Sequence, residues 1–179
     1  MPLVQEQRQA HLDRWIVTIT RLGDFHTQLV AAAVLCTLLL LARRWRHLLF
    51  AGSTLLITAL GNTTLKHGFA RARPDVLSEP LTTFSFPSGH SSAAFAFFLV
   101  LGVLAGRGQS ARLRLAWLVV ASLPALAIAL SRVYLGVHWP SDIIAGALLA
   151  SAVCGLSLAL CQRQETLPAL PARLWWIVL

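Results

Sequence analysis

The sequence predicts an all-α integral membrane helical bundle of about five transmembrane helices, preceded by an amphipathic interfacial helix. Hydrophobic residues make up 56% of the 179 positions and charged residues only 12%, about half of what a soluble domain carries. The apolar residues are gathered in five runs, each close to the length that crosses a bilayer. A mean hydropathy of +0.68 agrees with this assignment.

Residues 1–24 are expected to form the amphipathic segment. Its apolar side chains recur at helical spacing, at Leu12, Trp15, Ile16, Ile19 and Leu22. A tryptophan on such a stripe is typical of an anchor at the boundary between lipid and water. Gly23 and Asp24 are expected to end this helix.

The five predicted spans cover residues 25–42, 48–65, 91–105, 115–133 and 143–161. The third is short for a hydrocarbon core of roughly 30 Å, so its beginning is expected to be buried inside the protein. Gly146 and Ala150 give the fifth span a face of small residues for close helix packing. The chain thus divides into a segment 1–24, a membrane domain 25–161 and a tail 162–179. We expect the tail to be an interfacial anchor, or to be truncated because the chain is a fragment of a longer protein.

The positive charges predict an orientation. With five spans, the loop 66–90 and the connection 134–142 fall on the same side of the membrane. The other side receives seven arginines: Arg43, Arg44, Arg46, Arg107, Arg112, Arg114 and Arg163. By the positive-inside rule this second side is cytoplasmic, so the N-terminus, the loop 66–90 and the connection 134–142 are expected outside and the C-terminus inside.

The composition also excludes some functions. The net charge of +8 does not indicate nucleic-acid binding, because the arginines lie in short loops and form no continuous basic face. The three cysteines lie inside apolar runs, where they are expected to be packing residues. Near the polar loops the acidic residues Asp75 and Glu79 form no cluster for Mg²⁺, so no metal and no cofactor are predicted.

Three short polar clusters interrupt the apolar chain between residues 66 and 142. They are Lys66 with Arg73 and Pro74, then Pro87, Ser88, Gly89 and His90, then Ser131 and Arg132 with His138 and Asp142. Taken alone, Lys66 could equally be a lysine at a helix end whose side chain reaches the lipid headgroups. Together, however, the clusters place several cations on one side of the membrane, and cationic side chains are the groups that grip phosphate oxygens.

The second and third clusters each predict a specific local geometry. Ser88 is a natural N-cap, Gly89 allows close approach to the backbone, and the free N–H groups of a helix start bind anions. His138 and Asp142 are about one helical turn apart, so the carboxylate can accept the N–H of one imidazole nitrogen. The other nitrogen then carries a lone pair, as an oriented nucleophile or base requires.

The order of these motifs resembles the three-part signature of the type 2 phosphatidic acid phosphatase superfamily. All three parts are complete, over residues 66–142. The resemblance implies a membrane phosphatase domain at 25–161 in which His138 attacks phosphorus, Asp142 orients it and His90 protonates the leaving group. It also implies that Lys66, Arg73, Ser88, Gly89 and Arg132 hold the phosphoryl oxygens. Members of this family usually have six spans, whereas five are predicted here.

The resemblance implies metal-independent hydrolysis of a membrane lipid phosphate or pyrophosphate through a phosphohistidine. Undecaprenyl pyrophosphate, phosphatidylglycerophosphate and phosphatidic acid are the candidate substrates, and the bacterial inner membrane, with the site on its periplasmic or outer face, is the expected location. Two alternatives stay open: a lipid phosphotransferase that uses the same intermediate, and a non-catalytic module that binds lipid headgroups. The sequence does not select the substrate or the oligomeric state.

Overall fold

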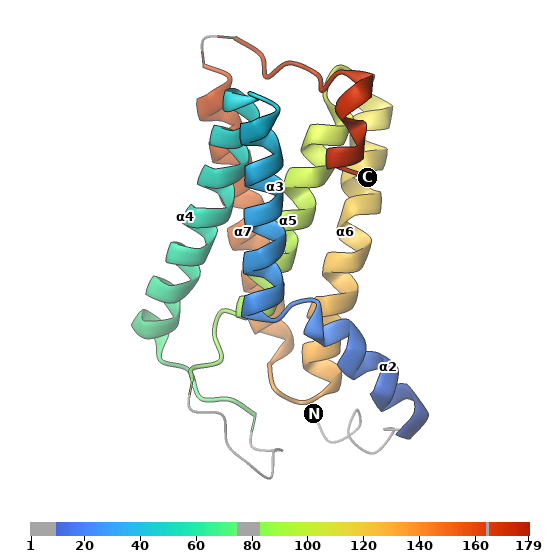
Figure 1. Cartoon of the computed structure of the whole chain (residues 1–179). Coiled ribbons are helices and arrows are strands. Elements are labelled where there is room, and N and C mark those ends of the chain that lie inside the picture. The colour runs from blue at the N-terminus through green and yellow to red at the C-terminus, as the bar shows by residue number, and fades with distance from the viewer. Residues whose placement is uncertain (1–9, 75–82, 164) are drawn as a thin grey trace.

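A computed structural model describes residues 10–74, 83–163 and 165–179 of the chain, with side chains from residue 12 onward. In these ranges all regular structure is helical. In chain order the helices are α2 (Ala10–Arg21), α3 (Phe25–Leu41), α4 (Trp45–Phe69), α5 (Gly89–Gly106), α6 (Ala111–Tyr134), α7 (Pro140–Cys161) and the 3₁₀ helix η1 (Ala172–Ile177) (Figure 1). The predicted all-α membrane bundle is confirmed.

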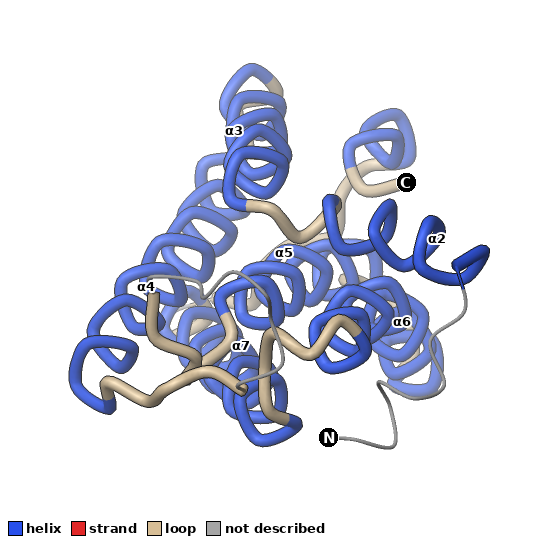
Figure 2. Tube along the Cα trace, turned by 90° about the horizontal axis from the view of Figure 1, so that it is seen from below, coloured by secondary structure: helices blue, strands red, loops and turns tan. Residues whose placement is uncertain are grey.

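Helix α5 is the centre of the bundle. It packs against α3, α4, α6 and α7, and Figure 2 shows these helices around it when the molecule is viewed from below. Small residues allow this close approach: a Cβ atom at Gly102 would lie 2.9 Å from Cβ of Ala121 and 3.1 Å from the carbonyl oxygen of Trp117, both on α6. The first turn of α5 is buried, with Ser91 and Ser92 both at or below 2% exposure, as its short predicted span required.

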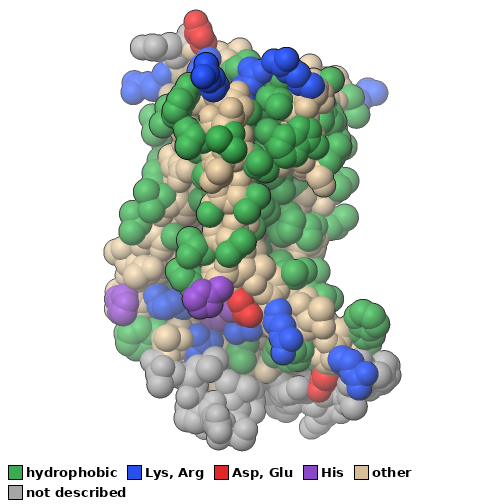
Figure 3. All heavy atoms as spheres, viewed as in Figure 1, with side chains coloured by type: hydrophobic (Ala, Val, Ile, Leu, Met, Phe, Trp, Pro, Cys, Tyr) green, Lys and Arg blue, Asp and Glu red, His purple; other side chains and the backbone are tan. Residues whose placement is uncertain are grey.

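The outer surface is built for lipid. Four helices, α4 to α7, are long and apolar enough to cross a membrane, and α2 with α3 counts as a fifth span if the bent pair is one span. Figure 3 shows Lys and Arg side chains at both ends of the molecule and hydrophobic side chains between them. Exposed leucines such as Leu49, Leu56 and Leu148 contribute to this apolar belt. The chain is therefore an integral membrane protein.

The helix boundaries differ from the predicted ones where polar residues continue a helix. Helix α4 extends to Phe69 instead of 65, so that Lys66 lies in its last turn. Helix α7 begins at Pro140 instead of 143, because proline suits the first helical position. Helix α2 ends at Arg21, and a bend of 46° separates it from α3.

The end of the bundle opposite the polar clusters holds the tail. The guanidinium of Arg46 donates to the carbonyl oxygen of Cys161 at 3.0 Å and pairs with Glu165 at 3.1 Å. Buried His47 bonds through Nε2 to the carbonyl oxygen of Pro168 at 2.9 Å. Three tail side chains complete one hydrophobic core with α3, α4, α5 and α7: Leu167, Leu170 and Ile177.

Candidate active site

The three polar clusters meet at one end of the bundle. The last turn of α4, the segment 71–74, the start of α5, the end of α6 and the connection into α7 all reach this end (Figure 1). Figure 3 shows cationic and histidine side chains there, below the apolar belt. Asp75 and Glu79 lie outside the described residues. Among the described residues, no three His, Cys, Asp or Glu side chains gather as a metal site would require.

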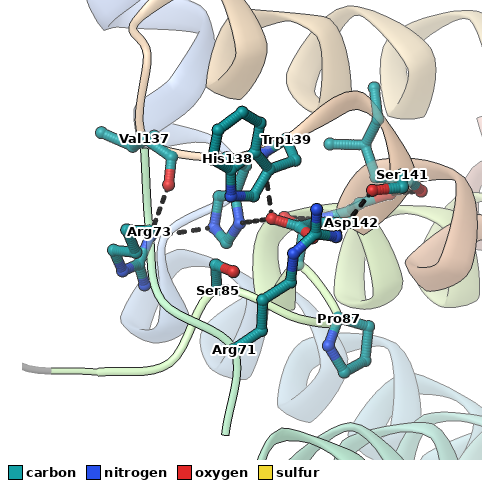
Figure 4. A network of polar contacts seen from close by, with 12 residues as sticks. Arg71, Arg73, Ser85, Pro87, Val137, His138, Trp139, Ser141 and Asp142 are labelled. Carbon is teal, nitrogen blue, oxygen red and sulfur yellow. Dashed lines mark hydrogen bonds and ion pairs between the residues drawn. The ribbon is translucent and has the colours of Figure 1, made fainter. Parts of the chain in front are cut away.

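The carboxylate of Asp142 lies at the centre of this end (Figure 4). It is completely buried. Its Oδ1 accepts from Nη1 of Arg71 at 2.9 Å, and its Oδ2 accepts from the backbone N–H of Trp139 at 2.9 Å and from Nδ1 of His138 at 3.3 Å. A buried charge is stable only when it is paired and hydrogen-bonded, and these donors satisfy both carboxylate oxygens.

The two neighbours of His138 determine the protonation of its ring. An ionised carboxylate only accepts hydrogen bonds, so the proton is on Nδ1, which faces Asp142. Nη1 of Arg73 lies 3.2 Å from Nε2, and a guanidinium only donates, so Nε2 carries the lone pair. Burial lowers the pKa of His138 to about 4, and Arg73 and Arg132 reinforce this shift against the opposing effect of Asp142. The imidazole is therefore neutral near pH 7 and presents a lone pair to the site.

Arg73 is held beside this lone pair by the chain around it. Its Nη1 also donates to the carbonyl oxygen of Val137 at 2.8 Å. Its Nε donates to the carbonyl oxygen of Thr83 and its Nη2 to the hydroxyl of the same residue, both at 2.8 Å. The guanidinium thus joins the two sides of the site and is aimed at Nε2 of His138.

Lys66 is oriented differently from a lysine that only reaches the headgroups. Its Nζ donates to the carbonyl oxygens of Phe84 at 2.8 Å and Pro87 at 3.1 Å. The ammonium therefore holds the segment that leads into α5, and it brings a positive charge next to Ser88.

The start of α5 has the predicted cap. The hydroxyl of Ser88 accepts from the backbone N–H of Ser91 at 3.4 Å, and the backbone N–H of Ser88 donates to the carbonyl oxygen of Asp142 at 3.0 Å. The hydroxyl of Ser91 donates to the carbonyl oxygen of Ile143 at 2.7 Å. The N-terminal end of α5, with Gly89 in its first position, is in this way fixed to the first turn of α7.

The remaining side of the site is formed by the corner between α2 and α3. His90 Nε2 lies 2.9 Å from Oδ1 of Asp24, and Nη1 of Arg132 donates to the hydroxyl of Thr20 at 2.9 Å. Nε of Arg132 is buried and has no hydrogen-bond partner among the described residues. Such an unpaired buried donor calls for a ligand or water that completes it.

The structure brings all eight predicted site residues to this end and adds three that the sequence motifs did not single out as site residues. Arg71 binds Asp142 and Ser141 and lies over the ring of Trp139, with Cζ 5.4 Å from the ring centroid. Thr20 and Asp24 come from the segment that the sequence assigned to the membrane interface. The sequence shows Arg71 between Lys66 and Arg73, but the orientation of its side chain toward Asp142 depends on how the loop folds.

Comparisons with known proteins agree with the motifs. A family model described as the PAP2 superfamily matches residues 46–165, more than half of the chain. The undecaprenyl-diphosphatase of Sulfolobus acidocaldarius is 30% identical over 168 residues, which cover 87% of this chain and 74% of that protein. The chain belongs to the PAP2 superfamily. The resemblance proposed from the three motifs is thereby confirmed.

Bacillus subtilis supplies a further match in sequence and a match in structure. Phosphatidylglycerophosphatase B is 35% identical over 91 residues, which are 48% of this chain and 43% of that protein. The crystal structure of a transmembrane PAP2-type phosphatidylglycerolphosphate phosphatase superposes with a TM-score of 0.73 at 25% identity, and covers 92% of this chain and 83% of that one. These relatives are named phosphatases, which confirms the prediction of an enzyme.

We predict that close packing at Gly146 positions the start of α5. A Cβ atom there would lie 2.9 Å from the carbonyl oxygen of Ser88 and 3.0 Å from the backbone nitrogen of Ser92. Because these are backbone atoms that cannot turn away, Gly146→Ala should cost about 1–3 kcal/mol, as other overpacked sites do. The melting temperature of the detergent-solubilised protein should fall by several degrees.

Gly155→Ala is the matched control on the same helix, because a Cβ atom at Gly155 meets nothing within 4 Å. The melting temperature of this variant should not fall below that of the unmodified protein. Equal melting temperatures for the two variants would show that the contact at Gly146 does not hold α5 in place.

Proposed function

We propose that this chain hydrolyses a phosphate or pyrophosphate monoester of a membrane lipid through a phosphohistidine on His138, without a metal ion. The observation that carries the proposal is the buried pair of His138 and Asp142. Its two neighbours fix the tautomer of the ring, with the proton on Nδ1 and the lone pair on Nε2 beside the guanidinium of Arg73. A fixed nucleophile next to a cation is the arrangement that phosphoryl transfer needs.

The reaction would proceed in two balanced halves. In the first, Nε2 of His138 attacks phosphorus, the bond between phosphorus and the leaving oxygen breaks, and His90 gives its proton to that oxygen. In the second, His90 takes a proton from water, the resulting hydroxide attacks phosphorus, and the P–N bond breaks to release inorganic phosphate. Asp142 stays ionised throughout and compensates the positive charge that develops on the ring of His138.

Cationic side chains would stabilise the phosphoryl group in place of a metal ion. When phosphorus approaches Nε2, the donor that Arg73 now directs at this atom can turn to a phosphoryl oxygen. Nε of Arg132 is a second donor, which lacks a partner among the described residues. The N–H groups at the start of α5, including that of Gly89, and the charge of Lys66 add to this cradle. No part of the scheme requires a cofactor.

The position of the site supports a lipid substrate. The cationic end lies directly below the apolar belt (Figure 3), so a headgroup could enter while its hydrocarbon chain stays beside the helices. The names of the relatives point to polyprenyl diphosphates and phosphatidylglycerophosphate. We infer a substrate of this class.

We predict phosphate release from at least one of undecaprenyl pyrophosphate, phosphatidylglycerophosphate and phosphatidic acid in the presence of a chelator. His138→Asn should reduce the rate roughly a thousandfold or more, because it removes the nucleophile. His26→Asn, at an exposed histidine in the first turn of α3, is the control and should keep its activity. A folded protein that releases phosphate from none of the three lipids, or an active His138→Asn variant, would contradict the proposal.

We also propose that the site opens to the periplasmic face of a bacterial inner membrane. The support is the ring of arginines at the opposite end of the bundle, on the loops that contain Arg43, Arg107 and Arg163. In a chain whose three native cysteines are replaced, Ala72→Cys marks the site end and Arg112→Cys the other end.

A membrane-impermeant maleimide should label the cysteine at position 72 in intact spheroplasts. The cysteine at position 112 should react only after the membrane is permeabilised. The reverse pattern would show that the site faces the cytoplasm. Both positions are exposed, so a lack of accessibility within the protein does not complicate the comparison.

A further inference from the structure

The corner between α2 and α3 contacts His90 through a carboxylate that its own helix does not use. Asp24 occupies the N-cap position of α3, where an aspartate usually accepts a hydrogen bond from the first turn. Its side chain makes no such bond. Oδ1 instead lies 2.9 Å from Nε2 of His90. Because a carboxylate only accepts, Nε2 of His90 carries a proton and Nδ1 is the nitrogen left for a substrate.

The backbone of the corner is also fitted to this histidine. A Cβ atom at Gly23 would lie 2.9 Å from Cδ2 of His90 and 2.5 Å from Cγ2 of Ile128. Glycine is therefore the residue that lets the corner come this close to the ring. One turn earlier, the hydroxyl of Thr20 binds Arg132. The same short segment thus contacts both the predicted acid and one predicted phosphate ligand.

We propose that Asp24 is a positioning residue that holds His90 as the proton donor for the leaving group. The proposal rests on the function proposed above. The titratable and charged groups that face His90 include Arg132, His138 and Asp24, and of these only the carboxylate favours a positively charged ring. With Nε2–H bound to Asp24, the ring is turned so that Nδ1–H is the proton for the leaving oxygen.

The site would then contain two histidine–carboxylate pairs with opposite tasks. Asp142 and Arg73 fix the tautomer of His138, with the proton on Nδ1 and the lone pair on Nε2, so that Nε2 can attack. Asp24 favours the charged form of His90, so that it can donate.

A purely structural role for Asp24 is disfavoured by its surroundings. Its side chain is half exposed, so its replacement leaves no cavity. An ion pair this exposed adds little to stability. Asparagine has the same shape and is also a good N-cap. Asp24→Asn therefore removes the charge and should leave the fold and the helix start unchanged.

The test compares two phosphate esters that differ in their need for a proton donor. A long-chain alkyl phosphate expels an alkoxide, which needs general acid catalysis, whereas 4-nitrophenyl phosphate expels a stable phenolate. Asp24→Asn should lower kcat roughly 10- to 100-fold for the alkyl ester, a part of what a general acid contributes. With the nitrophenyl ester, the decrease in kcat of Asp24→Asn should be much smaller.

Two variants make the comparison specific. Thr20→Val removes the hydrogen bond to Arg132. It should slow the hydrolysis of both esters to the same extent, because both reactions need Arg132 to hold the phosphoryl oxygens. His138→Asn should abolish both reactions. If the unmodified protein hydrolyses neither ester nor any lipid phosphate, the proposed function fails. The proposed role of Asp24 is wrong if the unmodified protein is active and Asp24→Asn has the same kcat with the alkyl ester. It is also wrong if Asp24→Asn lowers kcat equally for both esters.

A measurement without substrate completes the test. In protein with ¹⁵N-labelled histidine, the Nε2–H proton of His90 should give a downfield ¹H signal because it is bound to a carboxylate. This signal should shift upfield or disappear in Asp24→Asn and stay in Thr20→Val, with His90→Asn used for its assignment. An unchanged signal in Asp24→Asn would overturn the proposal.

Discussion

The buried carboxylate of Asp142 is the group on which the rest of this site depends. A negative charge with no exposed surface must be compensated locally, and its partners come from separate parts of the chain. Arg71 reaches it from the loop after α4, His138 from the connection after α6, and the backbone N–H of Trp139 from the start of α7. The backbone carbonyl oxygen of Asp142 accepts a hydrogen bond from the N–H of Ser88. One residue therefore fixes the proposed nucleophile, the loop after α4 and the proposed phosphate-binding start of α5 together.

The membrane explains why this chemistry is gathered at one end of the bundle. Charged side chains are costly in the hydrocarbon core, and the helices that cross it present leucine and alanine to lipid. Polar groups can accumulate where α4 to α7 end, because there they pair with one another and with loop carbonyls. The short, buried α5 is the link between the two regions: its first turn belongs to the site, and its remainder is the core of the bundle. A phosphate bound there stays within reach of a lipid whose chains never leave the bilayer.

Much of this arrangement could be predicted from the sequence, because its signals are local. Apolar runs define spans, and the four-residue spacing of His138 and Asp142 on a helix start defines their contact. What could not be predicted depends on tertiary direction. Nothing in the sequence shows that Asp24, which reads as the end of an amphipathic helix, turns away from its own helix to His90. In the same way, Lys66 is predicted to hold phosphate or to extend to the headgroups, but the fold also places the carbonyl oxygens of Phe84 and Pro87 at its ammonium.

In the proposed mechanism, Nε2 of His138 forms a covalent bond to phosphorus. Rapid alkaline quenching of the enzyme during turnover of a ³²P-labelled lipid phosphate, followed by peptide mass spectrometry, would detect this bond. We expect label on the peptide that contains His138, stable in base and lost in acid as a phosphoramidate is, and no label in His138→Asn. Label on another residue, or full turnover with no labelled protein at any quench time, would contradict it.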